Sequence, residues 1–155
     1  MSTIGVMLNV VSYIFFACGT CIDRLIIFHL DVIYKRMDPT LDQWKEISET
    51  VKKQKLLPFF DCAYQGFASG DATIDAASVR MFVEDGHHLA TVQSFSKNFG
   101  MYGQRIGALS VVGATEDEAK RVVSQMKLVI RPMYSNPPRH GARLVSTILE
   151  EWALK

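Results

Sequence analysis

The chain has 155 residues, a formal net charge of +1 at pH 7 and three cysteines. This length is sufficient for one domain with a buried core, and the near-zero charge argues against nucleic-acid binding through general attraction to phosphates. An odd number of cysteines does not form a simple disulfide framework. Cys18 and Cys21 have the C-x-x-C spacing of a redox pair or of half a metal site, but no second half follows, so we expect no metal.

Residues 1–37 form an apolar N-terminal segment that differs from the rest of the chain. The run IGVMLNVVSYIFFACGTC has almost no charge over about the length of a membrane span, although Asn9, Ser12 and Gly19 interrupt it. It lacks the leading positive charge of a secretory signal and the arginines of an organellar transit peptide. The following run, LIIFHLDVIY, predicts a buried strand. We favour core strand or helix for this segment, with a membrane anchor as the weaker alternative.

From Asp38 onward the pattern is that of an alternating α/β protein. Thr40 and Gln43 resemble a capping box, which predicts that a helix begins there. Its inward face is predicted to carry Leu41, Trp44, Ile47 and Val51. Buried strands are predicted at LLPFFD (56–61), HLATVQSF (88–95) and RIGALSVVG (105–113), and further helices over 76–84, 116–130 and 141–154.

The two last helices are amphipathic. Over 116–130 the inward positions are predicted to be Ala119, Val122, Val123, Met126 and Ile130. Over 141–154 they are predicted to be Leu144, Val145, Ile148 and Trp152. Strands that alternate with such helices predict a mostly parallel sheet flanked by helices on both faces.

Ligands of parallel sheets bind beyond the carboxyl ends of the strands. Polar side chains of different types fall at or just beyond two such ends, namely Asp61, Tyr64, Ser94, Ser96 and Lys97, and Arg105 follows the glycines after the second of them. A lysine attacks an aldehyde to form an imine, while hydroxyl groups and a guanidinium hold a phosphate. An acid opposite keeps a pyridine nitrogen protonated. Each residue alone is more often a cap or a solvated charge, so their joint order is what favours a cofactor site.

Three segments carry a resemblance to a known family: FFDCAYQGFASGD, QSFSKNFGMYGQRIGALSVV and IRPMYSNPPRHGAR. They resemble, in the same order, segments of the aspartate aminotransferases, which are pyridoxal-phosphate enzymes of fold type I. The resemblance covers Asp38 to about Trp152, so residues 38–155 are expected to form part of the large, cofactor-binding domain. It implies a transaminase of L-aspartate and 2-oxoglutarate, a homodimer, and a cytoplasmic protein with an organellar form as the alternative.

The resemblance also implies a role for each matching residue. Lys97 forms the Schiff base with pyridoxal 5'-phosphate, Asp61 pairs with the pyridine nitrogen, and Tyr64 binds the ring hydroxyl. The expected phosphate ligands are Ser94, Ser96 and Arg105. Arg131 corresponds to an arginine that binds the distal carboxylate of a dicarboxylic substrate in the partner subunit, whereas its plainer interpretation is a cation at a helix end.

The chain also departs from the family pattern. VIYKRM stands where the family has an Asn-Pro-Thr-Gly turn, and the glycine-rich phosphate loop, the stacking aromatic and the α-carboxylate arginine are absent. We therefore expect a truncated product that is inactive by itself, marginally stable and prone to self-association. One alternative is a non-enzymatic module that pairs with full-length subunits near Arg131 and the 139–154 helix. Another is a membrane-anchored remnant that uses residues 4–21.

Overall fold

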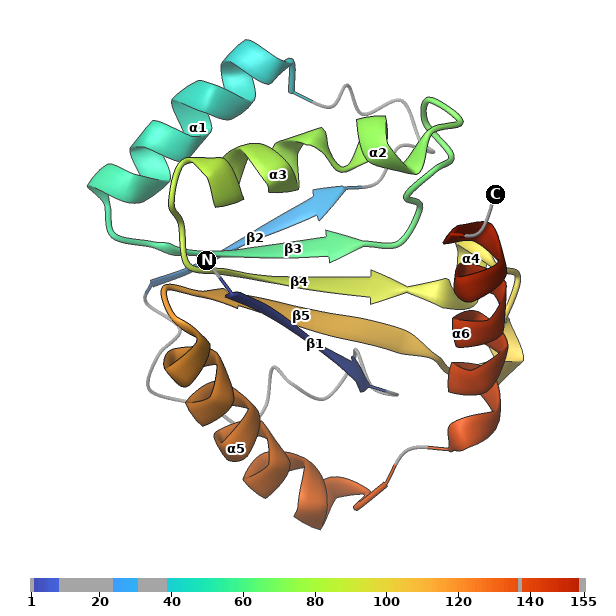
Figure 1. The fold of residues 1–155 in the computed structure, drawn as a ribbon. Helices are drawn as coiled ribbons and strands as arrows, with labels where there is room; N and C mark the ends of the chain where they lie inside the picture. Colours follow the sequence, from blue (N-terminus) through green and yellow to red (C-terminus); the bar gives the residue numbers. More distant parts are fainter. Residues whose placement is uncertain (1, 9–23, 31–38, 137, 154–155) are drawn as a thin grey trace.

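The computed structural model describes residues 2–8, 24–30, 39–136 and 138–153 (Figure 1). Its elements in chain order are β1 (Ser2–Leu8), β2 (Leu25–Leu30), α1 (Leu41–Lys53), β3 (Leu57–Cys62), α2 (Ala72–Asp75), α3 (Ala77–Glu84), β4 (Leu89–Ser94), α4 (Phe95–Asn98), η3 (Tyr102–Gln104), β5 (Gly107–Gly113), α5 (Glu116–Met133) and α6 (Arg139–Ala153). Cys18, Cys21 and most of the segment considered as an anchor lie outside the described residues. Within the described ranges, no helix has the length and apolarity needed to cross a bilayer.

The five strands form one sheet in the order β1-β5-β4-β3-β2. β2, β3 and β4 are parallel neighbours, and β5 lies antiparallel between β4 and β1. Four of the five strands therefore share one direction, which confirms the predicted mostly parallel sheet. Helices α1, α2 and α3 cover one face and α5 lies on the other, while α4 and α6 lie beyond the carboxyl end of β4 (Figure 1).

The reversed strand is β5, and the length of its connection explains the reversal. Between β4 and β5 the chain forms only the four-residue α4 and the three-residue η3 as regular structure. At about 1.5 Å per residue, α4 rises ~6 Å, whereas the six-residue β4 spans ~20 Å. With no longer helix to run back along the sheet, the connection stays at the carboxyl end of β4, and β5 runs antiparallel to it (Figure 1).

The start of α1 agrees with the predicted capping box. The Gln43 amide donates to Thr40 Oγ1 at 3.3 Å, and the Thr40 amide donates to Gln43 Oε1 at 2.9 Å. Trp44 and Val51 are buried as predicted, but Leu41 is 57% exposed. Leu41 is the first residue of α1 and lies at the end of the helix, where little neighbouring structure covers it. The prediction that Leu41 faces inward is therefore wrong.

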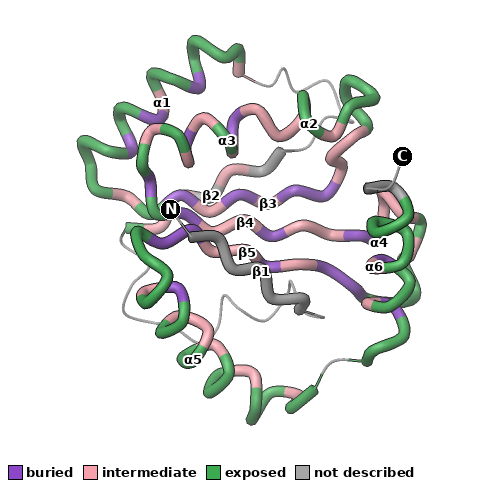
Figure 2. Tube along the Cα trace, in the orientation of Figure 1, coloured by how far each residue is buried: buried purple, intermediate pink, exposed green. Residues whose placement is uncertain are grey.

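The predicted inward face of the last helix is also partly wrong. Val145 is fully buried, whereas Leu144 and Ile148 are 38% and 42% exposed. Helix α6 instead packs through Val145 against Phe95 and Ile106, at the end of the sheet and not over a broad face. A narrow contact of this kind leaves much of an amphipathic helix uncovered (Figure 2).

The main core lies between α1, α3 and the sheet. Phe60 of β3 and Phe82 of α3 are both fully buried, and their ring centroids are 5.1 Å apart at an interplanar angle of 88°. Phe28 and Trp44 complete an aromatic cluster around them, with centroids 5.3 Å apart. Edge-to-face pairs of this type contribute free energy beyond their buried area. The aromatic cluster thus fixes the two helices on the sheet.

A polar cluster joins α1 to the turn before β4. The Ser48 hydroxyl donates to Asp85 Oδ2 at 2.5 Å, and His87 Nε2 lies 2.9 Å from Ser48 Oγ. Lys52 Nζ donates to the Asp85 carbonyl at 2.9 Å. Burial lowers the pKa of His87 below its ordinary value of 6.5, and Lys52 lowers it further, while Asp85 opposes them. His87 is therefore held neutral in the folded chain.

This cluster predicts a loss of stability in mild acid. Below about pH 6.5 the unfolded chain protonates His87 more readily than the folded chain, so the free energy of unfolding falls as the pH decreases. We expect the urea midpoint to decrease from pH 7.5 to pH 5.5, and to decrease less in His87→Gln. His88→Gln is the control, because His88 is half exposed and 3.6 Å from Glu118. An equal pH dependence in His87→Gln and in the unaltered chain would contradict this assignment.

Candidate active site at the strand ends

The candidate site begins at the carboxyl end of β3. Asp61 is half-buried and lies in register with Val92 of the neighbouring β4. Tyr64 follows β3 directly and is also half-buried. Parallel strands end at the same edge of a sheet, so the groups that follow β3 and β4 are brought together. The predicted convergence of these two segments is therefore a property of the sheet.

The loop after β3 is held by Asp75, which the sequence analysis did not identify. Asp75 Oδ2 accepts hydrogen bonds from the Gly66 and Ala68 amides at 2.7 and 3.1 Å. Its Oδ1 accepts from the Ser69 amide at 3.1 Å and from the Ser69 hydroxyl at 2.7 Å. Burial raises the pKa of Asp75, but these hydrogen bonds outweigh it and hold the pKa below its ordinary value. The ionised carboxylate thus fixes the loop that carries Tyr64.

The second side of the site is α4, which starts where β4 ends. Ser94 is its N-cap and accepts a hydrogen bond from the Ser96 amide at 3.3 Å. Ser96 is buried at 8% exposure. The helix ends after one turn at Asn98, and Gly100 follows with a φ of 66° and donates its amide to the Lys97 carbonyl at 3.1 Å. A residue with a side chain is strained at that φ, so Gly100 suits this abrupt end.

Lys97 and Tyr64 meet at the centre of the site. Lys97 Nζ lies 4.1 Å from the centroid of the Tyr64 ring. A cation over an aromatic face at this distance is attracted by the ring, typically by about 0.5–2 kcal/mol. The lysine on α4 is therefore held beside the phenol that follows β3.

Two of the predicted site residues, Arg105 and Arg131, do not take part in the Lys97–Tyr64 contact. Arg105 is exposed and follows η3 with a positive φ of 49°. It connects to α4 through the next residue, because the Phe95 amide donates to the Ile106 carbonyl at 3.1 Å. Arg131 is exposed in the last turn of α5, a helix that packs against β1 and β5. Within one chain, the structure does not bring Arg131 to Lys97.

Three amide side chains near the site carried no signal in the sequence. Gln93 Nε2 donates to Gln65 Oε1 at 2.7 Å and joins the end of β4 to the loop after β3. Asn98 Oδ1 is buried and has no hydrogen-bond partner among the described residues. Amide side chains are common throughout proteins, and their use here depends on the sheet having formed. The described ranges contain no group of three or more histidine, cysteine or acidic residues placed to hold a metal ion.

The chemistry of this set fits an aldehyde that carries a phosphate. An amine, a phenol and a carboxylate come from two adjacent strand ends, and a buried serine at the start of α4 adds a hydroxyl. These groups can bind a carbonyl, hydrogen-bond a ring hydroxyl and pair with a ring nitrogen. The Lys97–Tyr64 contact places an amine and a phenol close enough to reach one small molecule.

Comparison with known proteins places this geometry in a family. The family model for aminotransferase class I and II matches residues 37–155. The cytoplasmic aspartate aminotransferase of Oryza sativa subsp. japonica is 61% identical over 118 residues, which cover 76% of this chain and 29% of that protein. The mitochondrial aspartate aminotransferase of Dictyostelium discoideum is 61% identical over 115 residues, covering 74% and 27%.

Solved structures agree with the sequence relatives. The aspartate aminotransferase of Trypanosoma cruzi superposes with a TM-score of 0.78 at 40% identity, over 84% of this chain and 33% of that one. An aromatic-amino-acid aminotransferase of Burkholderia pseudomallei, solved covalently bound to pyridoxal phosphate, gives 0.77 at 43% identity, over 81% and 31%. The chain spans less than a third of the length of the curated relatives it matches. Since the family model covers most of the sequence, this chain belongs to the class I and II aminotransferases.

Proposed function

We propose that this chain is the cofactor-binding part of an aspartate aminotransferase and holds pyridoxal 5'-phosphate through Lys97. The observation that carries the proposal is the position of Lys97 Nζ, 4.1 Å from the centre of the Tyr64 ring at the ends of two neighbouring strands. The aspartate aminotransferases among its relatives support the choice of reaction. The proposed substrates are L-aspartate with 2-oxoglutarate, and oxaloacetate with L-glutamate in reverse.

Each residue of the set has a distinct task in this proposal. When bound, pyridoxal phosphate supplies an aldehyde for amino groups and a ring that accepts electrons from the Cα–H bond. Lys97 would bind the aldehyde carbon and move a proton at the substrate Cα, Asp61 would hold the proton on the ring nitrogen, and Tyr64 would donate to the ring hydroxyl. The phosphate would be held by Ser94, Ser96 and Arg105.

Arg131 gives the proposed substrate preference. Its guanidinium is exposed on α5 and has the bidentate geometry that favours a carboxylate. We propose that it binds the distal carboxylate of the substrate in the site of a second subunit, which requires a homodimer. The proposed compartment is the cytoplasm, as for the rice relative, with an organellar form as the alternative.

The proposal is tested by cofactor binding and not by turnover. We expect the purified chain with pyridoxal phosphate to show a visible absorbance band that changes with pH. After borohydride reduction, peptide mapping should place the adduct on Lys97, since reduction fixes the imine on the lysine that formed it. Adducts spread evenly over exposed lysines such as Lys53 and Lys120 would contradict the proposal.

A second candidate function is an interaction module that pairs with full-length subunits. The observation that favours it is the set of exposed apolar side chains on α5 and α6: Leu128, Val129, Met133, Leu144, Ile148 and Leu149. Such exposure is typical of an interface. Co-purification of the tagged chain with a full-length aspartate aminotransferase would support this function. Elution of the chain as a free monomer in that mixture would contradict it.

A further inference from the structure

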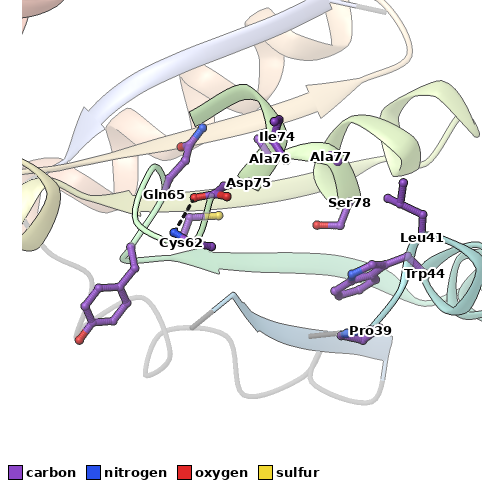
Figure 3. Close-up of a pocket in the computed structure, with 12 residues that line it drawn as sticks. Pro39, Leu41, Trp44, Cys62, Gln65, Ile74, Asp75, Ala76, Ala77 and Ser78 are labelled. Atoms are coloured by element: carbon purple, nitrogen blue, oxygen red, sulfur yellow. Dashed lines mark hydrogen bonds between the residues drawn. The ribbon is translucent and has the colours of Figure 1, made fainter. Parts of the chain in front are cut away.

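The two sides of the candidate site are held in different ways. On the β3 side, Asp75 lies in the wall of a cavity of about 190 Å³ and accepts a hydrogen bond from the Ala68 amide at 3.1 Å (Figure 3). On the other side, the segment that carries Arg105 connects η3 to β5. Helix α6 packs against this segment, and a glycine, Gly141, stands where the two meet.

Gly141 leaves no room for a side chain. It is buried in the first turn of α6. A β-carbon added there would lie 3.1 Å from Gln104 Cβ and 3.4 Å from Ile106 Cβ, closer than carbon atoms normally pack. Both atoms are attached directly to the backbone, so the segment itself would have to move. The φ of Gly141 is not positive, so the close approach, and not the backbone conformation, is what requires glycine here.

The two residues nearest to Gly141 flank Arg105. Arg105 has a φ of 49° and a ψ of 50°, a left-handed conformation that a residue with a side chain keeps only where its surroundings hold it. Gln104 ends η3, and Ile106 is buried against Val145, one turn after Gly141 on the same face of α6. Helix α6 therefore contacts the chain on both sides of the strained residue.

Arg105 lies at the same end of the sheet as the serines of the proposed phosphate site. Ser94 on β4 is opposite Gly107 on β5, and Arg105 comes two residues before Gly107. The Phe95 amide, directly after Ser94, donates to the Ile106 carbonyl, directly after Arg105, at 3.1 Å. Any displacement of the segment therefore changes the position of the arginine relative to the serines on either side of Phe95.

We propose that Gly141 is a positioning residue for phosphate binding. Its bare backbone lets α6 hold Arg105 where the guanidinium binds the cofactor phosphate together with Ser94 and Ser96. Guanidinium and phosphate pair through directional hydrogen bonds, so a small displacement weakens them. The inference rests on the proposed function, since it takes pyridoxal 5'-phosphate as the ligand, and it extends that function by assigning α6 the task of fixing the phosphate side.

The test uses the whole 155-residue chain and two aldehydes, pyridoxal 5'-phosphate and 5'-deoxypyridoxal, which lacks the phosphate. Their affinities are measured by absorbance titration, and borohydride reduction with peptide mapping counts only the adduct on Lys97. Gly141→Ala adds one methyl group at the contact. Gly103→Ala is the matched control, because a β-carbon at Gly103, one residue before Gln104, has no neighbour within 4 Å. Circular dichroism melting shows whether each variant is folded.

We expect the unaltered chain to bind pyridoxal 5'-phosphate more tightly than 5'-deoxypyridoxal. Gly141→Ala should weaken the phosphate-bearing aldehyde roughly fivefold, the effect of about one hydrogen bond, and leave the other within about twofold. Gly103→Ala should change neither. In an Arg105→Ala background, Gly141→Ala should have no further effect, because the residue through which it acts is gone.

The selectivity of the effect separates positioning from general destabilisation. The inference is overturned if Gly141→Ala weakens both aldehydes equally, weakens neither, or acts as strongly in the Arg105→Ala background. If Gly141→Ala does not fold, adding Gln104→Gly removes the nearest β-carbon and should restore both folding and the preference for the phosphate; failure of either overturns the inference. No adduct on Lys97 in the unaltered chain would overturn the proposed function and the inference together, whereas an adduct that Gly141→Ala leaves unchanged would overturn the inference alone.

Discussion

Replacing Lys97 with alanine is expected to remove the reduced pyridoxal-phosphate adduct from its peptide, by at least roughly tenfold in yield. The amine is the group that attacks the aldehyde, and Lys97 is the lysine whose amine lies over the Tyr64 ring. The visible absorbance band should disappear with it. The measurement is quantitative peptide mapping after borohydride reduction, at equal protein and cofactor concentrations.

The matched control is Lys120→Ala. Lys120 is exposed on α5 and pairs with Glu116 at 2.7 Å, one helical turn away, so its removal has little effect on the fold. The adduct at the candidate site should remain in this variant. If Lys97→Ala keeps the band, or if both variants lose it alike, the assignment of the cofactor lysine is wrong.

Replacing Phe82 with alanine is expected to give the largest loss of stability. The ring is fully buried and contacts Phe60, Trp44 and His87, with centroid distances of 5.1, 6.1 and 4.9 Å. Truncating a buried phenylalanine costs about 3–5 kcal/mol, a large share of the ~5–15 kcal/mol that holds a typical domain folded. The urea midpoint should fall by roughly 2 M.

Phe67→Ala provides the comparison for the core variant. Phe67 is the same residue type but is 55% exposed, and among the described residues its one ring contact is with Tyr64, with ring centroids 6.2 Å apart. Its loss should cost less than about 1 kcal/mol. Equal shifts of the urea midpoint in both variants would mean that the aromatic cluster does not hold α3 on the sheet.

The sequence predicted the elements that have a strong periodic pattern. The capping box at Thr40 and the amphipathic run from Glu116 placed α1 and α5 correctly, since both signals are local. The inward faces of α1 and α6 were partly wrong, because burial depends on how much neighbouring structure covers a helix. Leu144 and Val145 have the same local sequence pattern. They differ in burial because Val145 makes the narrow contact with Ile106 and Leu144 does not belong to that cluster.

The site was predictable in part for the same reason. Lys97 and Tyr64 could be placed together because parallel strands end at one edge, and the structure shows their contact. Asp75 could not be recognised as the residue that holds the loop, since an acid at the end of α2 looks like any surface charge until the loop amides of Gly66 and Ser69 turn toward it. The roles of the phosphate ligands and of Arg131 stay predictions.

The pairing of β1 with β5 constrains the order in which the strands can pair while the chain is being synthesised. Ser2 lies opposite Gly113, so β1 pairs in the sheet only after β5 has been made. At ~5–20 residues per second, β1 waits on the order of ten seconds for its partner. During that interval β2, β3 and β4 pair as they emerge. Among the five described strands, β1 is thus one of the last whose partner becomes available.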